Sequence, residues 1–113
     1  MRIAIIGSRT FNNYSFLKEI LLPHKHKITE IVSGGAKGAD SLGERFADEF
    51  KIPKKIFLPD WTTNGKAAGL IRNHDIIKNC DKVIAFWDGV SKGTKHALEL
   101  CSKYNKSYQI FKF

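Results

Sequence analysis

Short apolar runs alternate with amphipathic segments along the whole chain. The apolar runs predict five strands, which are Arg2–Ile6, Glu30–Ser33, Lys55–Leu58, Lys82–Trp87 and Ser107–Phe111. The amphipathic segments predict four helices, which are Tyr14–Leu22, Asp40–Phe50, Ala68–Asn79 and Gly93–Tyr104. This alternation is typical of a parallel sheet covered by helices on both faces. We therefore expect a single three-layer α/β domain over residues 1–113, with about five mainly parallel strands flanked by helices.

The order of strand, loop and helix predicts where a ligand binds. Right-handed crossovers bring every loop that follows a strand to the same edge of the sheet, and open α/β sheets bind ligands at that carboxyl edge. Four segments that are distant in sequence are therefore expected to meet there: Gly7–Thr10, Gly34–Asp40, Pro59–Gly69 and Asp88–Thr94.

The strongest motif runs from Ser33 to Asp40, where a strand ends, glycines turn the chain and a helix begins. Gly34, Gly35 and Gly38 let the backbone approach a phosphate closely, and the following helix offers free N–H groups. Lys37 adds a mobile cation. The alternative is a plain tight turn, although such a turn seldom needs three glycines and a lysine.

Three further motifs carry groups that bind anions: Gly7–Arg9, Ser91–Thr94 and Trp61–Asn73. Each has a simpler structural interpretation. The first can be a plain strand exit, the second a helix cap and the third a solvated helix face. Their residues, together with those of the glycine motif, form the predicted ligand site: Gly7, Ser8, Arg9, Ser33, Gly34, Gly35, Lys37, Gly38, Asp40, Arg72, Asn73, Ser91, Gly93 and Thr94. Trp61 is a candidate for stacking on a base.

Several common sites are absent from the sequence. The glycine motif reads GGxxG after the second strand, unlike the GxGxxG fingerprint after a first strand, and no GxxxxGK[ST] loop is present. NAD redox chemistry and ATP hydrolysis are therefore disfavoured. The four histidines lack partners at metal-ligand spacing, so we expect no metal and no cofactor.

Charge and cysteine content bear on partners and location. Lys and Arg outnumber Asp and Glu by 19 to 11, a net charge of +8, which favours anionic partners or simply aids solubility. Cys80 and Cys101 are far apart in sequence and are expected to be reduced thiols. No signal peptide or membrane span stands out, so we expect a cytoplasmic protein without a membrane partner.

Taken together, the motifs resemble the SLOG superfamily, which includes DNA-processing protein A and the cytokinin-activating LOG enzymes. They are most similar to its small single-domain branch, the YspA/YpsA-related proteins. The matching pieces span nearly the whole chain in the right order: Gly7–Arg9, Ser33–Asp40, Gly65–Gly69 with Arg72 and Asn73, and Ser91–Thr94.

The resemblance implies a Rossmann-like sheet and a ligand derived from a nucleotide. The LOG enzymes hydrolyse the N-glycosidic bond of nucleoside monophosphates, and their motif PGGxGTxxE supplies a catalytic glutamate. Gly93 and Thr94 match that motif, but Ala97 stands at the glutamate position. Glu99 follows two residues later, on a different face of the helix. The resemblance therefore gives no support to LOG-type hydrolysis.

Three functions stay open at this point, and whether the protein is an enzyme is left undecided. The first is a nucleotide-binding or nucleotide-sensing module. The second is a glycosidic or phosphate-ester hydrolase, for which Asp40 and Asp88 are the catalytic candidates. The third is a single-stranded DNA-binding protein. Part of its basic groove could come from Trp61, Trp87, Lys66, Lys92 and Lys95. A homo-oligomer is compatible with all three.

Overall fold

The computed structural model describes all residues, 1–113, and contains one five-stranded sheet. All strand pairs are parallel, and the order is β3-β2-β1-β4-β5. The strands are β1 (Arg2–Gly7), β2 (Glu30–Ser33), β3 (Lys54–Ile56), β4 (Lys82–Trp87) and β5 (Ser107–Lys112).

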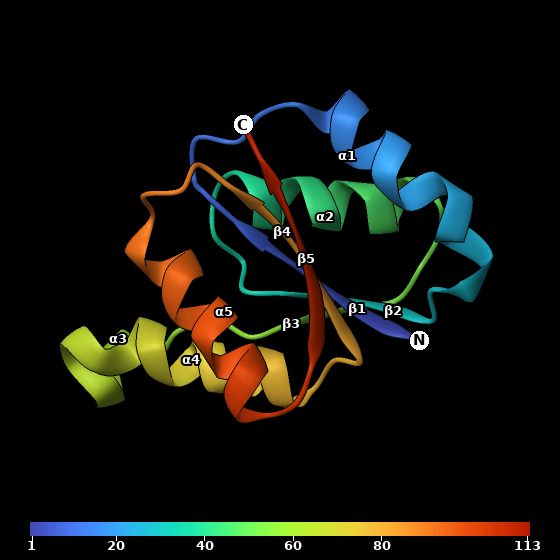
Figure 1. Cartoon of the computed structure of the whole chain (residues 1–113). Coiled ribbons are helices and arrows are strands. Elements are labelled where there is room, and N and C mark those ends of the chain that lie inside the picture. Colours follow the sequence, from blue (N-terminus) through green and yellow to red (C-terminus); the bar gives the residue numbers. More distant parts are fainter.

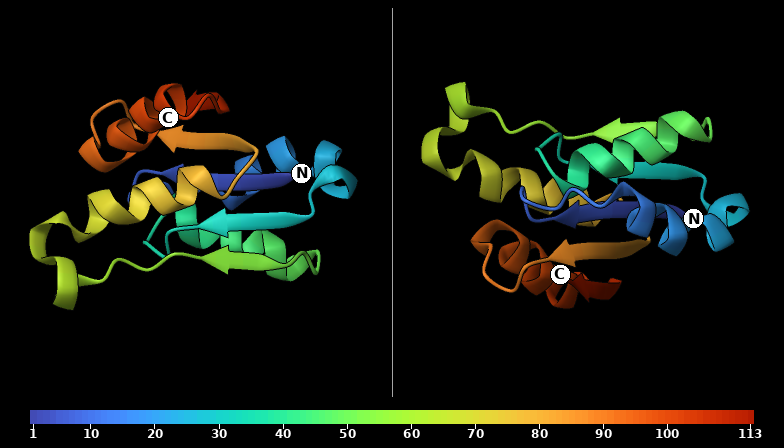
Figure 2. Two further views of the ribbon diagram at one scale, coloured as in Figure 1. Left: turned by 90° about the horizontal axis from the view of Figure 1, so that it is seen from below. Right: turned by 90° about the horizontal axis from the view of Figure 1, so that it is seen from above.

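Helices cover both faces of this sheet, so the expected three-layer α/β architecture is confirmed (Figure 1). The helices α1 (Tyr14–Leu21) and α2 (Ala39–Glu49) lie on one face. The helices α4 (Ala68–Lys78) and α5 (Lys92–Lys103) lie on the other, as Figure 2 shows.

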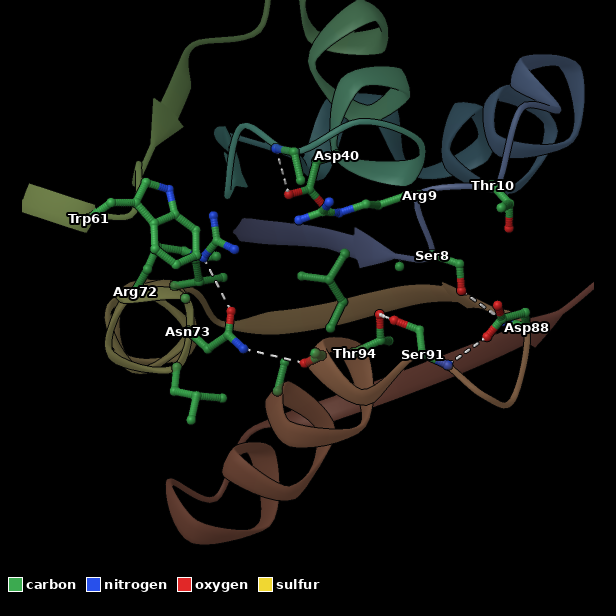
Figure 3. A pocket seen from close by; sticks show the side chains of 18 of the residues that line it. Ser8, Arg9, Thr10, Asp40, Trp61, Arg72, Asn73, Asp88, Ser91 and Thr94 are labelled. Carbon is green, nitrogen blue, oxygen red and sulfur yellow. Dashed lines mark hydrogen bonds between the residues drawn. The ribbon is translucent and has the colours of Figure 1, made fainter. Parts of the chain in front are cut away.

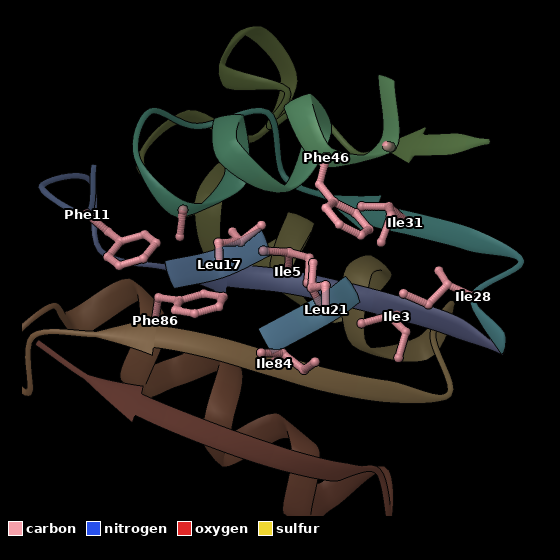
Figure 4. Close-up of a cluster of buried hydrophobic side chains, with 12 residues drawn as sticks. Ile3, Ile5, Phe11, Leu17, Leu21, Ile28, Ile31, Phe46, Ile84 and Phe86 are labelled. Carbon is pink, nitrogen blue, oxygen red and sulfur yellow. The ribbon is translucent and has the colours of Figure 1, made fainter. Parts of the chain in front are cut away.

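The core consists of two apolar layers separated by the sheet. Successive side chains of a strand point to opposite faces. Ile3 and Ile5 of β1 therefore pack against α1 and α2 (Figure 4), whereas Ala4 and Ile6 pack against α4 and α5. Cys80 and Cys101 lie in the second layer as free, buried thiols, as expected. No helix is long and apolar enough to cross a membrane.

The structure differs from the sequence predictions mainly between β3 and α4. β3 ends at Ile56 because its partner β2 is only four residues long and its last residue, Ser33, pairs with Ile56. The segment 59–69, expected to be a loop, contains α3 (Trp61–Asn64) and a 3₁₀ turn over Gly65–Ala67. Asp60 starts α3, since its Oδ1 accepts a hydrogen bond from the Thr63 amide at 3.1 Å.

A second 3₁₀ helix, η1 (Leu22–Lys27), extends α1 beyond its predicted end. Pro23 lies in its first turn, a position that suits proline because no intrahelical donor is lost there.

The strand order places a crevice at the carboxyl edge of the sheet. The chain runs outward from β1 through β2 to β3, then returns to the other side of β1 to form β4. The connections after β1 and β4 therefore leave the sheet toward opposite faces, which is the usual position of a ligand site in an open α/β sheet.

A pair of glycine substitutions tests this packing. A Cβ at Gly43, in the middle of α2, would lie 2.7 Å from the Cβ of the fully buried Ile5. We expect Gly43→Ala to lower the free energy of unfolding by about 1–2 kcal/mol, because the cost of overpacking exceeds the gain in helix propensity. Urea denaturation measures the change.

Gly69→Ala is the matched control, because its Cβ would approach only Trp61, at 3.8 Å. This substitution should leave stability unchanged or raise it by about 0.5 kcal/mol, through helix propensity alone. If Gly43→Ala were as stable as the control, the close contact of α2 with β1 would be wrong.

Candidate functional site

A cavity of about 510 Å³ opens at the crevice between the β1 and β4 connections (Figure 3). Its volume lies within the range of small-molecule sites, about 300–1,000 Å³. All four segments expected to meet at the carboxyl edge contribute to its lining, and α4 closes one side. The predicted convergence of the loops is confirmed.

The structure divides the predicted site residues into two groups. Those that line the cavity come mainly from the β1 loop, α4 and the start of α5: Gly7, Ser8, Arg9, Asp40, Arg72, Asn73, Ser91, Gly93 and Thr94. The catalytic candidate Asp88 also lines it. The remaining five belong to the glycine motif and do not line the cavity: Ser33, Gly34, Gly35, Lys37 and Gly38.

Three amides of the glycine motif, those of Gly34, Gly35 and Ala36, are already occupied by partners within the chain. Asp40 Oδ2 accepts hydrogen bonds from the Gly34 and Ala36 amides, each at 3.2 Å. The Gly35 amide donates to Ser33 Oγ, also at 3.2 Å. The Asp40 carboxylate therefore occupies the position that the sequence suggested for a phosphate.

The glycines of this motif are explained by contacts inside the protein. A Cβ at Gly34 would lie 2.6 Å from Arg72 Nη1 and 2.8 Å from Asp40 Oδ2. Gly35 has a φ of +72°, which side-chain-bearing residues rarely adopt, and a Cβ there would lie 2.5 Å from Leu58 Cδ2. The turn is tight because it wraps around Asp40 and Arg72.

Asp40 itself is the second residue of α2 and is only 6% exposed. Burial raises the pKa of its carboxyl to about 6, against the opposing effect of its hydrogen bond from Ala36 and of the nearby Arg72 guanidinium. The carboxylate is still the major form at pH 7, and it lies at a helix N-terminus, where negative charge is favourable.

Arg72 and Asn73 connect the two sides of the cavity. Arg72 Nη1 donates to the carbonyls of Gly34 and Phe57, and Arg72 Nε donates to Asn73 Oδ1 at 3.2 Å. Asn73 Nδ2 in turn donates to the Gly93 carbonyl at 3.3 Å. Burial lowers the pKa of Arg72, the Asp40 carboxylate opposes this shift, and the neighbouring Arg9 adds a smaller lowering effect. An arginine stays charged under these conditions.

The N-terminus of α5 forms the opposite wall and has no side-chain cap. Ser91 Oγ lies 3.3 Å from Thr94 Oγ1, so the two hydroxyls contact each other and leave the backbone without a cap. The first-turn amides of a helix have no intrahelical acceptor. The Lys92–Thr94 amides are therefore available to an anion at the cavity wall.

The loop that leads into α5 is held by two polar residues. Asp88 Oδ1 accepts hydrogen bonds from the Val90 and Ser91 amides, each at 2.8 Å, and these bonds lower the pKa of its carboxyl. Ser8 is buried, and its Oγ accepts a hydrogen bond from the Asp88 amide at 3.0 Å. Ser8 thus ties the β1 loop to the β4 loop.

Some lining residues were not among the predicted ligand-site residues, although Trp61 and Lys66 are candidates for base stacking and for a basic groove. Trp61 is 57% exposed and lies at one end of the cavity, and Lys66 lies in the turn that follows α3. Thr10 and Ala36 flank predicted residues but carry no recognisable signal of their own. No three His, Cys, Asp or Glu side chains come together in a way that could hold a metal ion.

Two solved structures share this fold. The X-ray structure of DNA processing protein A from Streptococcus pneumoniae aligns with a TM-score of 0.82 at 17% identity and covers 96% of this chain. DNA processing protein A from Helicobacter pylori, studied for its single-stranded DNA binding mode, aligns with a TM-score of 0.76 at 24% identity and covers 97%. The chain spans 49% and 64% of these two proteins, respectively.

The sequence itself also matches known proteins. The Gene 61 protein of Mycobacterium phage D29 is 31% identical over 111 residues, which cover 90% of this chain and 89% of the phage protein. Residues 1–63, more than half of the chain, match the model of a SLOG family. The chain belongs to the YspA, cpYpsA-related SLOG family.

Proposed function

We propose that this protein is a binding module that holds a nucleotide, or a ligand derived from one, at the carboxyl edge of its sheet. The observation that carries the proposal is the uncapped N-terminus of α5 in the cavity wall. Its free amides and the positive end of the helix dipole suit a phosphate. The Arg9 guanidinium, from the β1 loop, adds a second group that favours an anion.

The rest of the cavity suits the other parts of a nucleotide. Trp61 offers an exposed aromatic face on which a base can stack. Trp61 and the N-terminus of α5 lie at different ends of the cavity in Figure 3. A ligand with an aromatic ring at one end and a phosphate at the other would use both ends.

A hydrolase of the LOG type is less well supported. Ala97 lines the cavity at the position where those enzymes carry a glutamate, and Glu99 does not line it. Asp40 and Asp88 each use one oxygen to hold backbone amides, so their arrangement is explained without catalysis.

Single-stranded DNA binding is the second candidate. The net charge of +8 and the exposed Trp61 favour it, and so does the similarity in fold to a DNA processing protein studied for that activity. Against it, the Asp40 carboxylate lies across the cavity from the N-terminus of α5 and repels a continuous phosphate backbone.

Gly93→Val tests the phosphate position. Gly93 lines the cavity, and a Cβ built there meets no protein atom within 4 Å. The valine side chain is therefore tolerated by the fold but occupies space beside the first-turn amides. We expect it to weaken the binding of ribonucleoside 5′-monophosphates by at least about tenfold, since it removes one or more charge-assisted hydrogen bonds. Isothermal titration calorimetry with AMP, GMP, CMP and UMP measures the loss.

Ser102→Val is the matched control, because it introduces the same side chain at an exposed position near the other end of α5. It should bind like the wild type. If Gly93→Val also bound like the wild type, the N-terminus of α5 would not hold the phosphate. If the wild type bound none of the four nucleotides, the proposed function would be wrong for this ligand class.

Salt dependence separates the two candidates. A mononucleotide has few phosphate contacts, so we expect its affinity to change less than about fivefold between 50 and 200 mM salt. Single-stranded DNA with four neutralised phosphates would lose about 50-fold over the same range. A ten-residue oligothymidylate that bound more tightly than every mononucleotide, with this steep loss, would favour DNA binding instead.

A further inference from the structure

Asp40 has a free oxygen that the glycine motif does not use. Its Oδ2 accepts hydrogen bonds from the Gly34 and Ala36 amides, whereas its Oδ1 has no hydrogen-bond partner. No buried side-chain oxygen or nitrogen in this chain lacks a partner. Oδ1 must therefore reach the accessible surface, and since Asp40 is otherwise buried and lines the cavity, that surface is the cavity.

Neither Arg72 nor Arg9 forms an ion pair with Asp40. Arg72 directs its Nη1 to the Gly34 and Phe57 carbonyls and its Nε to Asn73. Asp40 Oδ1 therefore presents an acceptor without a hydrogen-bond partner to whatever the cavity holds, and the nearby Arg72 guanidinium offsets part of its charge. A charged acceptor in a half-enclosed site favours a hydrogen-bond donor and repels an anion.

A nucleotide bound as proposed offers few such donors. Its phosphate is repelled by Asp40 and belongs at the N-terminus of α5. Its base is expected at Trp61. In Figure 3 Asp40 lies at the upper side of the cavity, to the right of Trp61 and above Thr94, with the Arg9 side chain beneath it. The part of a nucleotide that joins base and phosphate is the sugar, and its donors are the ribose hydroxyls.

We infer that Asp40 Oδ1 accepts a hydrogen bond from a ribose hydroxyl, which makes the site selective for ribonucleotides over deoxyribonucleotides. This inference rests on the proposed function, because it assumes that a nucleotide occupies the cavity. It also gives Asp40 two separate roles: one oxygen shapes the glycine motif, and the other reads the sugar.

The test compares the affinity of each ribonucleoside 5′-monophosphate with those of its 2′-deoxy and 3′-deoxy forms. The wild type should prefer the ribonucleotide over at least one deoxy form by about 10- to 100-fold, the loss that accompanies one hydrogen bond to a charged group. The same ratio is then measured for Asp40→Asn. Asparagine can still accept from both amides through its oxygen, but it turns an NH₂ group toward the cavity. The preference should fall to about threefold or less, since this group is a donor without charge.

Thermal melting at two pH values tests whether Asp40→Asn is folded. Burial raises the pKa of Asp40 to about 6, above its usual value of 3.8, so the folded state binds a proton more tightly than the unfolded state. Ionisation of Asp40 therefore lowers stability as the pH rises between these values. The melting temperature of Asp40→Asn minus that of the wild type should therefore be larger at pH 7.5 than at pH 4.

Asp75→Asn is the matched control, because it makes the same carboxylate-to-amide change at an exposed position of α4 that does not line the cavity. It should keep the wild-type preference for ribonucleotides. Equal binding of ribo and deoxy forms by the wild type would overturn the inference and leave the proposed function intact. A change in base preference in Asp40→Asn, with the sugar preference unchanged, would also overturn it, because Asp40 would then contact the base. Failure of every nucleotide to bind the wild type would instead refute the proposed function.

Discussion

The carboxylate of Asp40 is the interaction on which the carboxyl edge of this sheet depends. It replaces an external anion in the turn after β2, where it accepts hydrogen bonds from the Gly34 and Ala36 amides. The turn then closes tightly enough for Arg72 to reach the Gly34 carbonyl from α4. Through Asn73 the same network reaches Gly93 at the start of α5. Three segments distant in sequence are thus joined by polar contacts around one cavity.

This arrangement gives the cavity two chemically different sides. In the turn after β2, the Gly34 and Ala36 amides are bound by Asp40 Oδ2, and Asp40 presents its other oxygen to the cavity. The N-terminus of α5 has unsatisfied amides and no cap, and Arg9 lies at the cavity with it. An anion is therefore favoured on one side and a hydrogen-bond donor on the other. A ligand that carries both groups, such as a ribonucleotide, matches the two sides.

The sequence predicted the sheet well because apolar runs report burial directly. All five strands and the four long helices were found, and the convergence of four loops followed from parallel topology. α3 was missed because a four-residue helix is too short to show periodicity, and its start depends on the cap at Asp60. The length of β3 was overestimated because this edge strand pairs only with β2, and β2 ends at Ser33, opposite Ile56.

Within the site, the sequence identified most of the lining residues but not how the glycine motif uses its amides. Glycines before a helix are typical of phosphate loops. Nothing in that pattern reveals that Asp40, a residue of the same motif, accepts the hydrogen bonds of the Gly34 and Ala36 amides. That contact depends on the three-dimensional course of the turn. The importance of Trp61 likewise depends on α3, which brings the indole to the cavity.

We infer that an anion binds at the N-terminus of α5, whereas the Gly34, Gly35 and Ala36 amides are already occupied within the chain. A titration of ¹⁵N-labelled protein with AMP, followed by heteronuclear NMR, tests it residue by residue. We expect the largest chemical-shift changes at the Lys92, Gly93 and Thr94 amides and little change at the Gly34 and Ala36 amides. The largest shifts at Gly34 and Ala36, with Gly93 and Thr94 unchanged, would contradict it.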